Sequence, residues 1–241
     1  MFSPTSVSSR VATDDVPPHI KAYVDRALSR AMRDPVGRRD FALLADGARV
    51  VRALTGAVSA GRFYEAQTHS VPPPNVTLVD DLHVGNCWSM AAPTGQLGIR
   101  LSERIYPTHV TVDHIPVEIA ADIGRAPRMM VLWGAIDGSV NIARLGNFTQ
   151  THNDAITRTH GRSRPHETAG CTFIPIASFE YDVRSHSHIQ TFPVLSHVVD
   201  LEMYFGVVVL EVVSNWGSET TCLYRARVHG QGVSQLHNGL V

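Results

Sequence analysis

The chain contains 13 histidines, a residue type that commonly binds metals. Two of them form the pair His186-x-His188, and three lie in the polar segment 147–170, namely His152, His160 and His166. A zinc site would need a recognisable ligand spacing, such as H-E-x-x-H or paired C-x-x-C, and the sequence contains neither. We therefore interpret these histidines as solvated loop residues and predict no metal centre built from them.

The sequence also lacks the motifs of an activated nucleophile. There is no G-x-S-x-G, no Gly-rich phosphate loop, and no cysteine in a recognisable His/Asn context. Asp80-Asp81 and Glu118 with Asp122 are candidate acid–base pairs, but sequence spacing does not give the separation in space that such catalysis requires. The motifs therefore favour a protein that is not an enzyme.

Two of the 3 cysteines have informative surroundings. Cys87 lies in Gly85-Asn86-Cys87-Trp88, and Cys222 lies in the last β-rich run of the chain. A bond between them would close a very long loop, which in the chain-entropy model stabilises a fold by ~4 to 5 kcal/mol. It would also require an oxidising compartment. From spacing alone, two buried thiols are at least as good an explanation.

The composition indicates a globular chain without an obvious nucleic-acid partner. Its 241 residues suit one large domain or two small ones, and 21 Lys+Arg against 22 Asp+Glu give a net charge of -1. Apolar residues make up 44% and charged residues only 18%, so a sizeable core can form and a partner can cover part of the surface. No apolar run reaches the ~18 residues of a membrane helix, and no secretory signal follows Met1.

The N-terminal region divides into a polar lead-in and a helix. Residues 1–18 are rich in Ser, Thr, Pro and Asp, and we predict that they are disordered. A helical apolar stripe follows and ends at Asp34-Pro35; it consists of Ile20, Tyr23, Val24, Ala27, Leu28, Ala31 and Met32. A helix of about four turns with so regular a seam either packs on the domain or joins a coiled coil.

Beyond Pro35 the pattern predicts short strands: Ala48–Leu54, Leu97–Leu101, His109–Ile115, Met129–Ile136 and Val207–Val213. A last strand alternates a small apolar face with a polar face that carries Leu223, Arg225, Arg227 and His229. Strands at this spacing, with almost no helix between them, predict a mainly β fold of the β-sandwich type. Segments 56–74 and 147–170 fit no element, and loops of that length are either functional or disordered.

Several motifs that follow one another along the chain resemble those of SUN domains. The most specific is Ser214-Asn215-Trp216-Gly217 followed by the run Thr221 to Gly230, T-C-L-Y-R-A-R-V-H-G. The others are Asp40-Phe41-Ala42-Leu43 with Gly47-Ala48, Gly85-Asn86-Cys87-Trp88 with Leu101-Ser102, Thr111 to Pro116, Ala126-Pro127-Arg128, and Ile189-Gln190-Thr191-Phe192. Together they cover roughly residues 20–230.

The resemblance implies a fold, a location and a partner. It implies a jelly-roll-like β-sandwich at 35–230 that trimerises on a coiled-coil stalk at 19–34 and ends in a tail at 231–241. Such domains face the perinuclear space from the inner nuclear membrane, through a transmembrane segment that this chain does not include. As non-enzymatic tethers they bind the luminal C-terminal tail of KASH proteins and so link the two nuclear membranes. Residues 56–74 would be the KASH lid, a hairpin that pairs with the peptide, and 147–170 an insertion.

The same resemblance implies a disulfide, a cation site and a peptide pocket. Cys87 and Cys222 would form the intramolecular disulfide of the family, and we expect Cys171 to be free. The resemblance implies no cofactor beyond a structural monovalent cation, K⁺ or Na⁺, held by the backbone carbonyls of Val76, Val79, Asp81, Asn86 and Tyr224. The end of the KASH peptide would be bound by His114, Arg125, Thr220 and Tyr224.

Three residues depart from the family pattern. Thr55 stands where some members carry a Cys that bonds covalently to KASH, so that bond cannot form here. Arg125 and Thr220 replace a Ser and a Tyr that animal members place against the peptide terminus, and a guanidinium can bind a carboxylate through paired hydrogen bonds. The alternative function is a ligand- or carbohydrate-binding β-sandwich. Such a module would need exposed aromatic platforms, whereas the tryptophans lie in motifs that look structural: Trp88, Trp133 and Trp216.

Overall fold

The computed structural model describes residues 16–31, 34–57, 72–151 and 159–234 and divides the chain into two units, 1–37 and 38–241. The first unit contains helix α1 (Pro18–Ala31), which confirms the predicted helix. Its apolar stripe is solvent-exposed at Ile20, Tyr23, Val24 and Leu28. Most of the predicted disordered lead-in and the end of the stripe at Met32 lie outside the described residues. Within the described ranges, no helix is long and apolar enough to cross a membrane.

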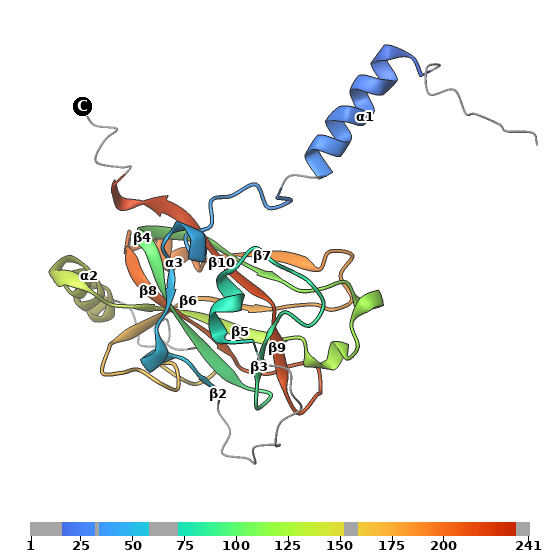
Figure 1. Cartoon of the computed structure of the whole chain (residues 1–241). Helices are drawn as coiled ribbons and strands as arrows, with labels where there is room; N and C mark the ends of the chain where they lie inside the picture. The colour runs from blue at the N-terminus through green and yellow to red at the C-terminus, as the bar shows by residue number, and fades with distance from the viewer. Residues whose placement is uncertain (1–15, 32–33, 58–71, 152–158, 235–241) are drawn as a thin grey trace, which may run out of the picture. The chain divides into compact units, whose positions relative to one another are not determined.

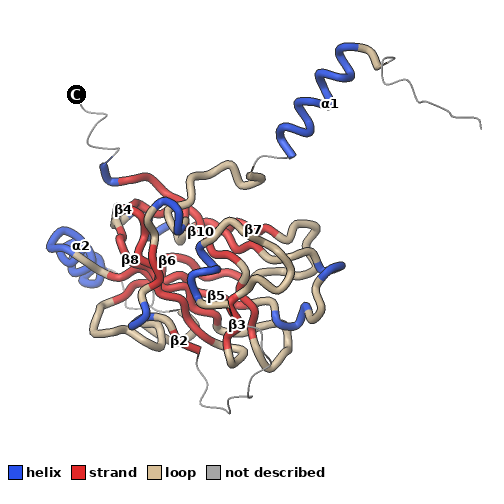
Figure 2. The backbone as a smooth tube through the Cα atoms, in the orientation of Figure 1, coloured by secondary structure: helices blue, strands red, loops and turns tan. Residues whose placement is uncertain are grey.

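The second unit is mainly β, as predicted (Figure 2). Its paired strands are antiparallel. The strands are β1 (Arg49–Val50), β2 (Gly56–Ala57), β3 (Trp88–Met90), β4 (Gly95–Asp113), β5 (Met129–Ala135), β6 (Phe173–Glu180), β7 (Ile189–Pro193), β8 (Phe205–Val212), β9 (Thr221–Leu223) and β10 (Arg225–Gly232). The helices are α2 (Gly138–Thr151) and α3 (Ser196–Asp200), with short 3₁₀ turns η1 (Leu44–Asp46), η2 (Arg52–Leu54), η3 (Pro74–Leu78), η4 (Val117–Ile119) and η5 (Ile123–Arg125).

Strand β4 connects the two layers of the sandwich (Figure 1). Its first half pairs with β1, β2 and β8, and β8 continues through β5 to β6. Its second half pairs with β7 on one side and β10 on the other. The register of its pairing with β8 shifts between Arg100 and Ile105, and such irregularities let one strand serve two sheets. The predicted strands 97–101 and 109–115 are therefore two parts of one strand.

The core explains why the central strands read as continuous apolar runs. In β5, Met130 and Leu132 pack into the main core, while Val131 and Trp133 pack into a second cluster with Val209. Because successive side chains of a strand point to opposite faces, β5 buries both of its faces. The two clusters together exclude water from both sides of the central sheet.

Helix α2 corrects the prediction that residues 147–170 form a loop throughout. The helix runs from Gly138 to Thr151, so the first residues of the predicted insertion are helical. Asn141 anchors it because its buried side-chain amide donates a hydrogen bond to the Tyr204 carbonyl at 2.6 Å. The helix was missed because its apolar residues form no continuous stripe: Val140 and Ile142 are exposed, and Leu145 packs against the core. Residues 152–158 lie outside the described residues.

Two other boundaries differ from the sequence prediction. The strand expected at Ala48–Leu54 ends at Val50, because the chain turns into η2, where the Leu54 amide donates to the Val51 carbonyl at 3.0 Å. Strand β10 continues to Gly232, two residues beyond the predicted end of the domain at residue 230. Most of the hairpin predicted at 56–74, namely residues 58–71, lies outside the described part of the chain.

Candidate peptide-binding site

A cavity of about 410 Å³ is lined by segments that are far apart in the sequence: the loop before β3, β3 itself, the turn after β4, η5 and the β9–β10 junction. Its wall includes three of the four residues predicted to bind the peptide end: His114, Arg125 and Tyr224. The fourth, Thr220, bonds to the Arg125 side chain and is not part of the wall. The structure thus gathers these four residues, and their binding of a peptide stays a prediction.

The predicted disulfide between Cys87 and Cys222 is present. The two Cα atoms lie 5.5 Å apart across 135 residues of sequence, and the bond joins the start of β3 to β9. Both cysteines are buried in a small cluster with Ile115 and Tyr224, which also line the cavity. Cys171 is free and exposed, as expected. The disulfide therefore fixes one wall of the cavity.

Arg125 brings a positive charge to the cavity. Its Nε donates to Thr220 Oγ1 at 3.0 Å, and its Nη2 donates to Ser89 Oγ at 2.7 Å. Both partners are neutral hydroxyls, and no ion pair of Arg125 with a carboxylate occurs among the described residues. The guanidinium is therefore oriented by the protein but not neutralised by it, which suits the binding of an anionic group.

His114 and Tyr224 also line the cavity, with ring centroids 4.8 Å apart in an edge-to-face arrangement. The Tyr224 hydroxyl accepts a hydrogen bond from the Gly85 amide at 3.2 Å, which leaves its own proton for a further acceptor. His114 Nδ1 lies 3.0 Å from the Ile115 carbonyl, so this nitrogen is assigned as the donor.

The remaining ring nitrogen of His114 is an acceptor. Burial lowers the pKa of His114, so the ring is neutral at pH 7, and Nε2 carries a lone pair rather than a proton. Nε2 is itself buried and has no hydrogen-bond partner in the described part of the chain. A buried polar atom without a partner is costly, which makes it a good site for a donor from a ligand.

Four of the five residues whose carbonyls were predicted to bind a cation lie in η3 or in the loop between η3 and β3, and the fifth, Tyr224, lies between β9 and β10. The Val76 carbonyl accepts from the Val79 amide at 3.2 Å, and the Asp81 carbonyl accepts from Asn86 Nδ2 at 3.4 Å. Each of these oxygens retains a second lone pair, and backbone oxygens are ligands that hard cations prefer. Among the described residues, no three His, Cys, Asp or Glu side chains gather at one point, so a cation here would depend on carbonyls.

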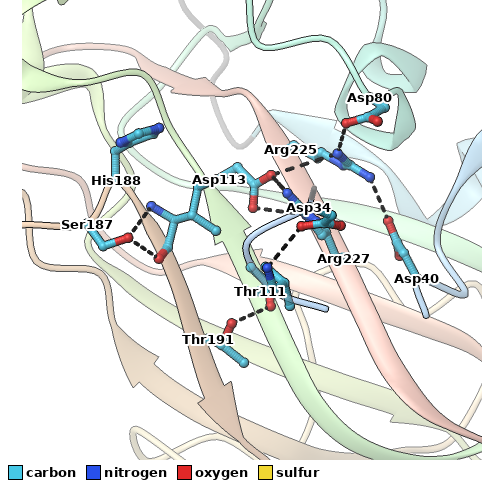
Figure 3. Close-up of polar contacts among 12 residues, drawn as sticks. Asp34, Asp40, Asp80, Thr111, Asp113, Ser187, His188, Thr191, Arg225 and Arg227 are labelled. Carbon is cyan, nitrogen blue, oxygen red and sulfur yellow. Dashed lines mark hydrogen bonds and ion pairs between the residues drawn. The ribbon is translucent and has the colours of Figure 1, made fainter. Parts of the chain in front are cut away.

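The predicted polar face of the last strand is buried and carries two paired arginines (Figure 3). Arg225 and Arg227 are 3% and 2% exposed. Arg225 bonds to Asp80 and, at 3.2 Å, to Asp40, while Arg227 Nε bonds to Asp113 Oδ2 at 2.9 Å. His229 is also buried, and it contacts Thr111 at 2.8 Å. These contacts fix the backbone directly after Tyr224 and directly before His114.

The two carboxylates of each candidate acid–base pair have different surroundings. Asp80 bonds to Arg225, whereas Asp81 bonds to His83. Asp122 caps η5 through the Gly124 amide at 3.0 Å and accepts from Ser218 at 2.7 Å. Glu118 lies in the wall of a second cavity of about 440 Å³, together with His186 and His188.

Sequence reasoning missed Ser89 and Gly85, which orient Arg125 and Tyr224. Ser89 was missed because β3 was not recognised as a strand. In that strand Ser89 pairs with Cys222 of β9, the residue whose side chain is bonded to Cys87. The conformation of Gly85 offers a weaker signal, since it adopts a positive φ of 87° that favours glycine.

The tryptophans do not form a carbohydrate platform. Trp88 and Trp133 are buried, and Trp133 Nε1 donates to Glu211 at 2.8 Å. Trp216 is half-buried beneath two guanidinium groups, those of Arg128 and Arg184, at 4.6 and 5.3 Å from its ring centroid. All three side chains are therefore occupied by contacts within the domain.

Comparison with known proteins identifies the family. The family described as Sad1 / UNC-like C-terminal matches residues 67–171 and 161–232. The chain is 29% identical to SUN domain-containing protein 2 of Mus musculus over 88% of its length, and 28% identical to SUN domain-containing protein 1 of Homo sapiens over 95%. It is 26% identical to SUN domain-containing protein 3 of Mus musculus over 93% of its length.

The chain therefore belongs to the Sad1/UNC-like family of SUN-domain proteins, and the resemblance found in the motifs is confirmed. It spans 26% of the length of each of the first two relatives and 62% of the third. Among solved structures, a family 32 carbohydrate-binding module from Streptococcus pneumoniae EndoD covers 80% of this chain and 100% of its own at 12% identity, with a TM-score of 0.47. That likeness is too weak to support a shared function.

Proposed function

We propose that this domain is a non-enzymatic tether that binds the C-terminal end of an extended KASH peptide. The observation that carries the proposal is the gathering of Arg125, Tyr224 and His114 around one cavity, with a guanidinium that has only neutral partners. Membership of the SUN family supports the choice of KASH proteins as partners and the perinuclear space as the location. In that setting the domain would link the inner to the outer nuclear membrane.

The chemistry of the three side chains gives each a distinct role. Arg125 and Tyr224 would donate hydrogen bonds to the terminal carboxylate, because the first is charged and the second has a free hydroxyl proton. Neutral His114 would accept a peptide N–H at Nε2, which also satisfies a buried atom. The site would therefore recognise both the charge and the backbone direction of the peptide end.

Assembly and a cation would support this site. The exposed stripe on α1 is suited to pack against copies of itself, and we propose that three chains associate through it as a coiled coil. A K⁺ or Na⁺ ion held by the carbonyls of the η3–β3 loop would hold Gly85 near Tyr224. The lid predicted at 56–74 would add backbone hydrogen bonds along the peptide.

Titration calorimetry with a matched pair of variants tests the proposal. The domain, fused to a trimeric coiled coil, is titrated with a KASH tail peptide from the organism that carries this chain. Arg125→Ala should weaken binding by about tenfold or more, since hydrogen bonds to charged groups contribute about 1.5–3 kcal/mol. The control is Arg128→Ala, whose side chain pairs with Glu180 outside the cavity. Equal losses for both variants would refute the pocket, and no binding by the unmodified domain would refute the tether.

A further inference from the structure

Two polar side chains lie buried side by side on the central sheet. Gln96 of β4 and Glu211 of β8 are cross-strand partners, and they are 0% and 4% exposed. Their apolar neighbours belong to the second cluster, which includes Val131, Trp133 and Val209. A polar group in such surroundings needs partners, since burying it without them is costly.

Each of the two side chains has a partner in one segment, residues 159–170, which we call the strap. Its Arg162 donates from Nη1 to Glu211 Oε1 at 2.5 Å, and Trp133 satisfies the other oxygen at 2.8 Å. Further along the strap, Glu167 bonds to Gln96 through its backbone: the amide donates to Oε1 at 2.8 Å and the carbonyl accepts from Nε2 at 3.0 Å. The strap is thus clamped to the sheet at two adjacent points.

The Gln96 side chain also bonds to a second segment of the chain. Its Nε2 donates to the Leu54 carbonyl at 2.9 Å, so one side-chain amide joins the strap to the η2–β2 corner, residues 52–57. Both Nε2 hydrogens and the Oε1 atom of Gln96 are therefore hydrogen-bonded. Exchanging the positions of Nε2 and Oε1 would place the oxygen against two carbonyls, so the orientation of the amide is fixed.

The η2–β2 corner lies very close to β4. A Cβ atom at Gly98 would fall 2.4 Å from Leu54 Cβ, so only glycine fits beneath the corner. Thr55 Oγ1 donates to the Val51 carbonyl at 2.8 Å and accepts from the Gly98 amide at 3.0 Å. Strand β2 then pairs with Gln96 and Gly95. Gln96 therefore contacts the corner both through its side chain and through the β2–β4 pairing.

We propose that the strap positions the η2–β2 corner through Gln96. In this view the insertion of this chain is a positioning element, and the Arg162–Glu211 pair holds it in place. The corner leads into the segment predicted as the lid, so the consequence for peptide binding rests on the proposed function, whereas the coupling itself does not.

Hydrogen exchange followed by mass spectrometry on the full chain, without peptide, tests the coupling. Arg162→Met removes the clamp at Glu211 without touching Gln96, and Gln96→Leu removes the shared amide. Each should speed exchange by about fivefold or more in fragments covering 159–170 and also in fragments covering 52–57, as expected for the loss of about 1 kcal/mol. Fragments from β10 serve as the internal reference for global stability. Glu167→Ala is the matched control, because Glu167 anchors the strap through its backbone.

The outcomes separate the possibilities. Faster exchange in both regions, with β10 and Glu167→Ala unchanged, supports the proposal. Faster exchange in the strap alone in Arg162→Met would show that the corner is independent of it and would overturn the proposal. An unchanged strap in Arg162→Met, or equal changes in Glu167→Ala, would overturn it too. Because Arg162 is partly exposed, its variant should fold even if Gln96→Leu does not. No peptide is needed, so failure of the proposed function leaves this test intact.

Discussion

The Cys87–Cys222 disulfide should contribute a large share of the stability of the domain. The bond spans 135 residues, and the chain-entropy relation for a loop of that length gives about 5 kcal/mol at 25 °C. Domains of this kind are stable by about 5–15 kcal/mol in total, so loss of the bond would remove a third or more of that margin. The buried sulfur atoms add packing against Ile115 and Tyr224.

The perturbation that isolates the bond is Cys87→Ala/Cys222→Ala, because alanine leaves no buried hydroxyl without a partner. Urea unfolding of the oxidised wild type and of the double variant should differ by about 3–5 kcal/mol. The reduced wild type should resemble the double variant. Cys171→Ala is the control, since that thiol is exposed and free, and it should change stability by less than about 0.5 kcal/mol. A loss below about 1 kcal/mol in the double variant would refute the reasoning from loop length.

Three further predictions follow from the same structure. Arg227→Met should lower the free energy of unfolding by about 3 kcal/mol, because it removes the closer of the two guanidinium groups that pair with buried Asp113, whereas Arg128→Met should cost less than about 1 kcal/mol in the same urea assay. Burial lowers the pKa of both His114 and His229, so on acidification the unfolded chain takes up protons before the folded chain does. The free energy of unfolding should therefore keep its full value above about pH 6.5. Below that pH it should fall by up to about 1.4 kcal/mol per pH unit for each histidine, until the pH reaches the folded pKa. Equal urea midpoints at pH 7.5 and 5.5 would contradict this. Light scattering should show trimers for the domain fused to a trimeric coiled coil and, at high concentration, for the chain alone, and a monomer in both would contradict the role of α1.

The sequence predicted those features whose signal is local or carried by a motif. The stripe on α1 was found from its spacing, and the β-rich runs at 129–136 and 207–213 correspond to β5 and β8. The disulfide depended on the motif context, since spacing alone could not choose between a bond and two thiols. The pairing of β3 with β9 brings the two cysteines close enough to bond, and no local sequence pattern predicts that pairing.

Long-range contacts explain what the sequence could not predict. Arg225 and Arg227 occupy alternate positions of a strand and were predicted to share a polar face, and the structure shows that both are buried. Their partners Asp40 and Asp113 lie 185 and 114 residues away, so no local pattern reveals that the charges are matched. Helix α2 was missed for the opposite reason: Val140 and Ile142 face solvent while Leu145 packs inward, so its apolar residues form no continuous stripe.

The central claim, that the cavity binds the free C-terminus of a peptide, is tested most directly by changing the peptide end. Two KASH tail peptides that differ only in a terminal carboxylate or a terminal amide are titrated into the trimerised domain and into its Arg125→Ala variant. We predict that amidation weakens binding to the unmodified domain by about tenfold or more, and that the variant discriminates much less between the two peptides. Equal affinity of the unmodified domain for both peptides would contradict the account.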